Sequence, residues 1–217
     1  MQVIEQATVV DAAFVPVPGL RERRRLATER EVGDAALTLF EARGVAATTV
    51  GDIARAAGIS ERTFFRYFSS KEETVLDFQY WFRAPTLAWL ATGTTDAPVL
   101  GQLESVCAGV LHELDGPGRD AAKRLRRIRT LMKSEPTLRA VSATLDHERA
   151  YRLADQIVDA FGGRVSELEA RIAAEVVGVG LRAACERWSA QLDAGRPATL
   201  EESYRIVRGT MRALLAP

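Results

Sequence analysis

Apolar side chains recur every three or four residues along most of this chain, which is the spacing of one face of an amphipathic helix. The first clear stripe includes Val32, Leu39 and Phe40 and ends at Gly44, a residue type that closes helices at little conformational cost. No stretch alternates polar and apolar residues as a half-buried strand would. The pattern therefore predicts an all-α protein.

Two short helices joined by a tight turn are predicted next. Thr49 begins the first, and Asp52, three residues later, completes a capping-box pattern. Gly58 makes the turn and Ser60 caps the second helix. Together they predict a helix-turn-helix over residues 49–68, an arrangement that docks on duplex DNA.

The second of these short helices has an inward and an outward face. Phe64 and Phe68 are four residues apart and should both point into the core. The outward face would then enter the major groove, where Arg62 and Arg66 can pair with guanine. Solvated arginines on an ordinary helical bundle are the alternative. The candidate DNA-contacting residues are Thr49, Ser60, Arg62, Thr63, Phe65, Arg66, Tyr67 and Lys71.

Helical spacing continues to the end of the chain. A connecting helix is predicted from residue 71 to 81 or 91, with Pro85 kinking or splitting it. Ser166 with Glu169, and Thr199 with Glu202, mark the starts of the last two helices. Between the connecting helix and the last two helices, three further helices are predicted over residues 98–116, 121–134 and 138–161.

The segment from Leu26 to Ala84 resembles the DNA-binding domain of the TetR/AcrR family of transcriptional regulators. The resemblance is carried by Thr48-Thr49-Val50, Ala57-Gly58-Ile59-Ser60 and Thr63-Phe64-Phe65-x-Tyr67-Phe68. It implies that Thr49, Tyr67 and Lys71 contact the DNA backbone, and that a homodimeric repressor binds a palindromic operator. The segment departs from the family pattern at Gly51, where a larger polar residue is common.

The resulting domain prediction has three parts. An N-terminal tail covers residues 1–20, a helix-turn-helix DNA-binding domain covers 21–86, and a helical ligand-binding and dimerisation domain covers 87–217. The basic run Arg21-Glu22-Arg23-Arg24-Arg25 either starts the first helix in solvent or, as in TetR-like proteins, forms an arm that reaches the minor groove.

The last two helices are expected to form the dimer interface, mainly because the family resemblance implies a four-helix bundle across a two-fold axis. Gly180 lies in an apolar stripe, where a glycine usually permits close helix approach. The alternative is that these helices only close the core of one chain. The predicted interface residues are Val176, Val177, Gly180, Leu181, Ala184, Ile206, Val207 and Met211.

An effector pocket is expected in the middle of the chain, where aromatic and flexible side chains could line a cavity. A basic helix around Arg124 and Arg127 resembles a regulator subgroup that binds acyl-CoA-like ligands, whose phosphates arginines could grip. A solvated basic face is an equal alternative. The candidate ligand-binding residues are Phe78, Trp81, Phe82, Trp89, Arg124, Arg127, Met132, Tyr151 and Trp188.

Composition excludes several other classes. The 217 residues carry no formal net charge, although residues 19–71 hold a small basic excess, which fits a few placed DNA contacts. Cys107 and Cys185 lie in apolar patterns and are interpreted as buried free thiols. Because the sequence shows neither a signal peptide nor a membrane-spanning run, we expect a cytoplasmic protein.

Catalysis is not expected. The only histidines, His112 and His147, have no neighbours in a nucleophile or metal-ligand pattern, so the sequence predicts no catalytic residue, metal or cofactor. The predicted partners are double-stranded operator DNA, a second copy of the chain and a small effector. Control by a protein partner in place of a small molecule is the main alternative, and an enzyme on a helical fold is the remote one.

Overall fold

The structure is a computed structural model that describes residues 19–76, 79–94, 96–116 and 120–215. All regular elements in these ranges are α-helices, which confirms the predicted fold class. Their bounds are α1 Leu20–Arg43, α2 Val50–Ala56, α3 Glu61–Tyr67, α4 Glu73–Leu76, α5 Gln79–Thr92, α6 Val99–Asp115, α7 Asp120–Ser134, α8 Pro136–Ala160, α9 Glu167–Asp193 and α10 Leu200–Leu215. In the described part of the chain, no helix combines the length and apolarity needed to cross a bilayer.

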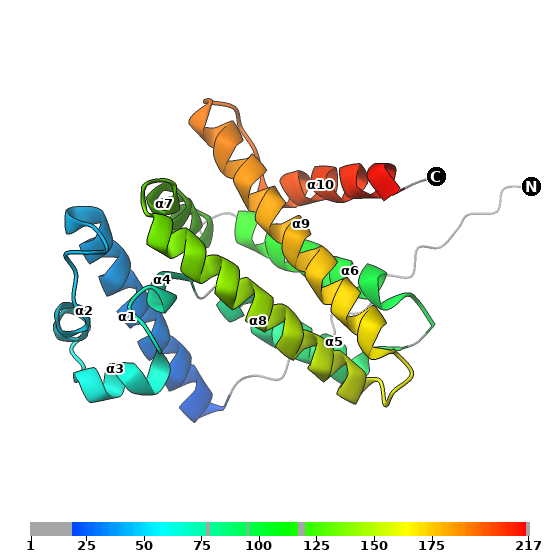
Figure 1. Ribbon diagram of the computed structural model, residues 1–217, viewed down its shortest axis with the longest axis horizontal. Coiled ribbons are helices and arrows are strands. Elements are labelled where there is room, and N and C mark those ends of the chain that lie inside the picture. Colours follow the sequence, from blue (N-terminus) through cyan, green and yellow to red (C-terminus); the bar gives the residue numbers. More distant parts are fainter. Residues whose placement is uncertain (1–18, 77–78, 95, 117–119, 216–217) are drawn as a thin grey trace, which may run out of the picture.

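Two buried clusters organise the helices. One holds α1 to α4 together around Val32, Phe40 and Phe64, and the other lies among α6, α8, α9 and α10 around Leu111 and Trp188. Figure 1 shows the first group at one end of the molecule and α9 with α10 toward the other. The α7 and α8 helices contribute buried side chains to both clusters.

The N-caps predicted for the last two helices are present in the structure. Ser166 accepts a hydrogen bond from the Glu169 amide at 3.2 Å, and Thr199 accepts one from the Glu202 amide at 3.1 Å. The helix predicted to connect the two parts corresponds to α4 and α5 on either side of residues 77–78, which lie outside the described residues. The four-residue α4 precedes α5, and Pro85 lies inside α5 without ending it. Residues 1–18 of the predicted N-terminal tail lie outside the described residues, and Leu20, the last residue of that tail, already belongs to α1.

Candidate nucleic-acid interface

The start of α2 is fixed by a complete capping box. Thr49 Oγ1 accepts from the Asp52 amide at 3.1 Å, and Asp52 Oδ2 accepts from the Thr49 amide at 3.1 Å. The hydrogen bond from the Thr49 hydroxyl is the main reason that the pKa of Asp52 is lowered, and nearby Arg43 adds to it. The Arg43–Asp52 ion pair, with an N–O distance of 2.6 Å, joins the end of α1 to the start of α2.

Lys71 braces the turn between α1 and α2. Its ammonium group donates hydrogen bonds to the carbonyls of Val45 and Thr48, each at 2.8 Å. The Thr48 side chain is fully buried, and its hydroxyl donates to the Gly44 carbonyl at 2.9 Å. Lys71 was expected to anchor a DNA phosphate, but these contacts hold two of its three donors inside the protein.

The α3 helix separates its faces as predicted. Phe64 and Phe68 are buried, and their ring centroids lie 5.5 Å apart. Ser60 caps the helix by accepting from the Thr63 amide at 3.1 Å. The exposed positions on the other face include Arg62, Arg66 and Phe65, whose side chain is 57% exposed although it is apolar. Arg62, Phe65 and Arg66 therefore lie exposed on the free face of α3.

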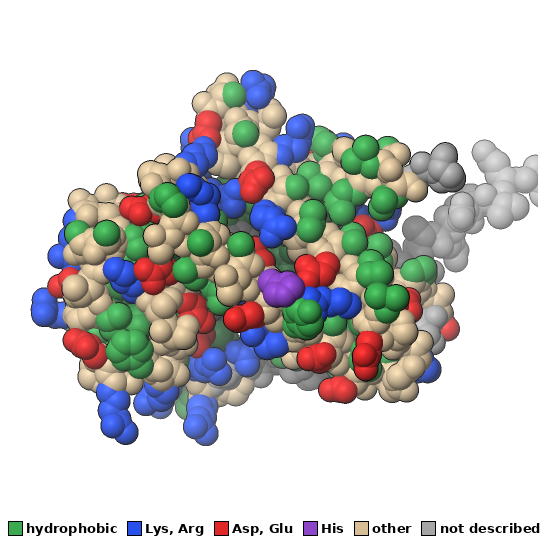
Figure 2. All heavy atoms as spheres, in the orientation of Figure 1, with side chains coloured by type: hydrophobic (Ala, Val, Ile, Leu, Met, Phe, Trp, Pro, Cys, Tyr) green, Lys and Arg blue, Asp and Glu red, His purple; other side chains and the backbone are tan. Residues whose placement is uncertain are grey.

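Tyr67, a predicted DNA contact, and the start of α1, whose basic run was predicted to be either a solvated helix start or a minor-groove arm, lie beside this surface. The Tyr67 ring is half-buried, and its hydroxyl accepts a hydrogen bond from Arg66 at 3.1 Å. Arg21, Arg23 and Arg24 are exposed on the first turns of α1, so this basic run is helical. Figure 2 shows Lys and Arg side chains projecting from the edge that carries α3 and the start of α1. Basic and aromatic groups thus converge on one edge of the molecule.

The surface predicted to form the dimer is partly exposed and partly internal. Val177 and Ala184 are buried in the core of the chain, whereas Val176, Leu181, Ile206, Val207 and Met211 are half-exposed. Other apolar side chains of these two helices are more exposed still. They are Leu168, Ile172 and Val179 on α9 and Leu214 and Leu215 on α10. Figure 2 shows hydrophobic side chains gathered over α10 and the neighbouring part of α9.

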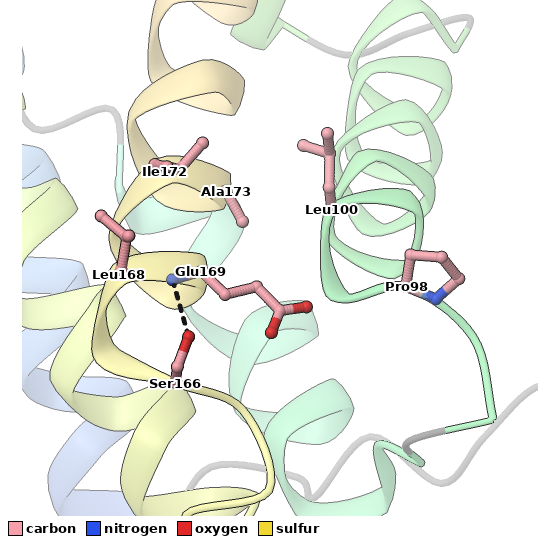
Figure 3. A pocket seen from close by; sticks show the side chains of 7 residues that line it. All are labelled: Pro98, Leu100, Ser166, Leu168, Glu169, Ile172 and Ala173. Carbon is pink, nitrogen blue, oxygen red and sulfur yellow. Dashed lines mark hydrogen bonds between the residues drawn. The ribbon is translucent and has the colours of Figure 1, made fainter.

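An apolar groove continues this surface at the start of α9. It has a volume of about 380 Å³ and lies between the first turns of α6 and α9. Figure 3 shows Pro98 and Leu100 on one side and Leu168, Ile172 and Ala173 on the other. The groove and the exposed α9 and α10 side chains form one apolar region.

Two ion pairs with a buried glutamate hold α10 against α6 of its own chain. Glu104 of α6 is only 6% exposed and accepts hydrogen bonds from Arg208 at 2.7 Å and Arg212 at 2.6 Å. These arginines come from a point in the sequence more than 100 residues later, so no local pattern indicated the pairing. The pairing places α10 against α6, with Leu200 and Tyr204 buried and Leu214 and Leu215 exposed.

The aromatic residues predicted to line an effector pocket mostly form core. Trp188 is buried, and Trp81, Phe82 and Trp89 are half-buried against the same cluster. Tyr151 is 50% exposed and lies under the Arg171 guanidinium. Met132 packs on the other cluster, beside α1, so it does not face the same space. Phe78 lies outside the described residues.

Arg124 and Arg127, the predicted phosphate ligands, face α1. Arg124 Nε lies 2.7 Å from Asp34 Oδ1, and Arg127 binds both carboxylate oxygens of Glu41 at 2.9 and 2.6 Å. Hydrogen bonding to Glu41 is the main reason that the pKa of Arg127 is raised. The prediction that these two arginines bind the phosphates of a ligand therefore does not match the contacts, because both guanidinium groups already have carboxylate partners.

Comparisons with known proteins agree with the N-terminal geometry. Residues 33–77 match the family model described as "Bacterial regulatory proteins, tetR family". Over 49 residues the chain is 53% identical to MftR of Mycobacterium tuberculosis, named as a mycofactocin biosynthesis transcriptional regulator; the match covers 23% of this chain and 25% of MftR. Over 59 residues it is 49% identical to the HTH-type transcriptional regulator TcmR of Streptomyces glaucescens, covering 27% and 26%.

The chain thus matches about a quarter of the length of these curated relatives. A solved transcriptional regulator from Aquifex aeolicus VF5 aligns over 87% of this chain and 99% of its own, at 16% identity and a TM-score of 0.42. The relatives over the N-terminal region are transcriptional regulators and not enzymes. Residues 33–77, which contain the helix-turn-helix of α2 and α3, therefore match the tetR family of bacterial regulatory proteins.

Proposed function

We propose that the protein is a transcriptional regulator that binds a two-fold-symmetric DNA operator as a homodimer and represses until a small, largely apolar effector releases it. The observation that carries the proposal is the outward face of α3. Arg62, Phe65 and Arg66 are exposed there, while Phe64 and the Ser60 cap hold the helix in place. A capped helix with guanidinium groups on its free face suits the major groove.

Each predicted contact then has a role. Arg62 and Arg66 read bases, and Thr63 and Phe65 contact thymine methyl groups or phosphates. Thr49, Ser60 and Tyr67 contact the DNA backbone and so position the duplex. Thr49 and Ser60 lie at the starts of α2 and α3, where amide groups favour phosphates. Lys71 contributes chiefly by holding the turn that precedes Thr49.

The dimer is proposed to form through the apolar region of α9 and α10. Leu168 is 70% exposed and Leu214 79% exposed, and burying such side chains against a second copy would be favourable. A two-fold axis through this region would direct two α3 helices toward successive major grooves.

The effector is proposed to bind among the aromatic side chains of α5, where Trp81, Phe82 and Trp89 are half-buried. An acyl-CoA-like compound would have to compete with Asp34 and Glu41 for the arginines of α7. The ion pairs therefore favour an apolar effector without phosphates over one that carries them.

Selection from a pool of random DNA duplexes tests the proposal. Purified protein should enrich a palindromic sequence, and Arg62→Ala should lose the preference at one position of each half-site. Arg187→Ala removes a charge from an exposed position on α9 and serves as the control. Failure to enrich any sequence would overturn the proposal. Titrating the enriched protein–DNA complex with apolar metabolites then identifies the effector. If only a protein fraction releases the DNA, the regulator is controlled by a protein partner and not by a small molecule.

A further inference from the structure

The basic side chains of α7 divide between two other helices. Arg124 and Arg127 pair with carboxylates of α1, while Arg129 and Lys133 pair with Glu186 and Asp193 of α9. The buried apolar side chains of α7 divide in the same way. Leu125 belongs to the buried cluster around α9, and Ile128 and Leu131 belong to the one around α1. Both clusters and four cations therefore meet on this one helix.

The contacts on the α1 side are well formed. The Arg124 side chain is only 15% exposed, whereas that of its partner Asp34 is 46% exposed, so water reaches the pair from the Asp34 side. Arg127 binds Glu41 with two parallel hydrogen bonds, a geometry that fixes orientation as well as distance. Gly33 leaves room for the first pair, because a Cβ there would lie 2.5 Å from Arg124 Nη2.

A third contact extends the same connection. Just after α7, Glu135 accepts a hydrogen bond from the Val45 amide at 3.3 Å. Val45 lies in the turn that Lys71 also holds, immediately before the helix-turn-helix. The α7 helix and the residue that follows it thus contact α1 at Asp34 and Glu41 and the turn after α1 at Val45.

We infer that Asp34, Glu41, Arg124 and Arg127 are positioning residues that set the orientation of α3 relative to α9, and with it the half-site spacing that the dimer accepts. The inference rests on the proposed function, because half-site spacing has meaning only for a dimer that binds DNA. If α9 lies at the two-fold axis, a rotation of α1 against α7 changes the separation of the two α3 helices. The ion pairs oppose that rotation.

A distance measurement within one chain tests the positioning step without DNA. Spin labels on Ala56→Cys of α2 and Ala190→Cys of α9 occupy exposed positions. Burial raises the pKa of the native Cys107 and Cys185 thiols to about 12, so these residues should stay unlabelled. Chains diluted with unlabelled protein should give one narrow distance distribution, and Glu41→Gln with Asp34→Asn should broaden or shift it.

Two control variants separate positioning from general destabilisation. Arg126→Gln removes a charge from an exposed position of the same helix and should leave the distribution unchanged. The exchange Glu41→Arg with Arg127→Glu restores an opposite-charge pair and should recover the narrow distribution. The inference is wrong if the distance distribution of the Glu41→Gln, Asp34→Asn variant matches that of Arg126→Gln. It is also wrong if the charge-exchanged chain folds but does not recover the narrow distribution.

Selection from duplexes with randomised half-site spacing provides the functional readout. The parent should enrich one spacing, and the Glu41→Gln with Asp34→Asn variant should lose that preference while keeping the same half-site sequence. A variant that keeps the parent's spacing preference would overturn the inference and leave the proposed function intact. A parent that enriches no DNA would overturn the proposed function, and the distance measurement would still decide the positioning step.

Discussion

Gly180 of α9 lies directly against the ring of Tyr204 on α10. A Cβ at position 180 would be 3.3 Å from Tyr204 Cε2 and 3.7 Å from the Met211 sulfur. The glycine was expected to permit close approach between two chains. Its contacts show that it permits close approach of α10 within one chain, which is the alternative left open by the sequence.

Replacing this glycine should therefore affect folding before assembly. Gly180→Leu should destabilise the chain by about 1–3 kcal/mol, because the added side chain must displace a buried tyrosine. Urea denaturation at several protein concentrations would measure this loss. Gly178→Leu is the matched control, since a Cβ there meets nothing within 4 Å in the described chain. Equal stability of the two variants would contradict the packing argument.

The exposed leucine and isoleucine of α9 should govern assembly. Leu168→Glu with Ile172→Glu should dissociate the dimer with little effect on folding, since the side chains are 70% and 52% exposed in a single chain. Sedimentation velocity would follow the dissociation, and circular dichroism the fold. Leu87→Glu, at a 49% exposed position on α5, is the control. An intact dimer in the doubly substituted variant would rule out this part of α9 as the interface.

Lys71 should act on DNA binding through the turn that it braces. Lys71→Met leaves the Val45 and Thr48 carbonyls without this donor, at a cost on the order of 1–3 kcal/mol of stability. Operator affinity should fall at every salt concentration while the salt dependence stays the same. A salt slope reduced by about one would instead identify a direct phosphate contact. Lys123→Met, with an 82% exposed side chain, controls for loss of charge.

Base reading by α3 predicts a different signature. Arg62→Ala or Arg66→Ala should each cost about 1–3 kcal/mol of operator binding and relax the preference at one base pair per half-site. Competition between the operator and singly substituted operators would measure this. A uniform loss across all sequences would assign the arginine to the DNA backbone.

The link between α6 and α10 should respond to pH through His112. Its Nδ1 lies 2.8 Å from Glu201 Oε2, and this hydrogen bond is the main reason that its pKa is raised above the ordinary 6.5. A raised pKa in the folded chain stabilises the protein below pH 6.5, and this contribution is lost as the pH rises through the folded value. The urea midpoint of the parent should fall over that range relative to His112→Gln. Parallel pH profiles would show that the pair contributes no measurable stability.

Local patterns predicted the helix-turn-helix because its determinants lie within three or four residues of one another. Thr49 and Asp52 form one such cap, and Phe64 and Phe68 form one buried pair. The partners of Arg124 and Arg127 lie 90 and 86 residues away, so the sequence showed a basic helix without showing what it binds. Aromatic content likewise cannot distinguish a cavity from a core, and Trp188 proved to be core.

The division of α7 between two cores also has a consequence for modularity. Relatives could exchange the helix-turn-helix domain at the conventional boundary after α4 or α5. This exchange would separate Asp34 and Glu41 from their ion-pair partners, the arginines of α7. The unit that can be transplanted is therefore α1 to α4 together with the α1-facing residues of α7. A chimera built with both parts should keep a functional helix-turn-helix domain. In a chimera built without the α7 residues, the orientation of this domain relative to α9 should be poorly fixed.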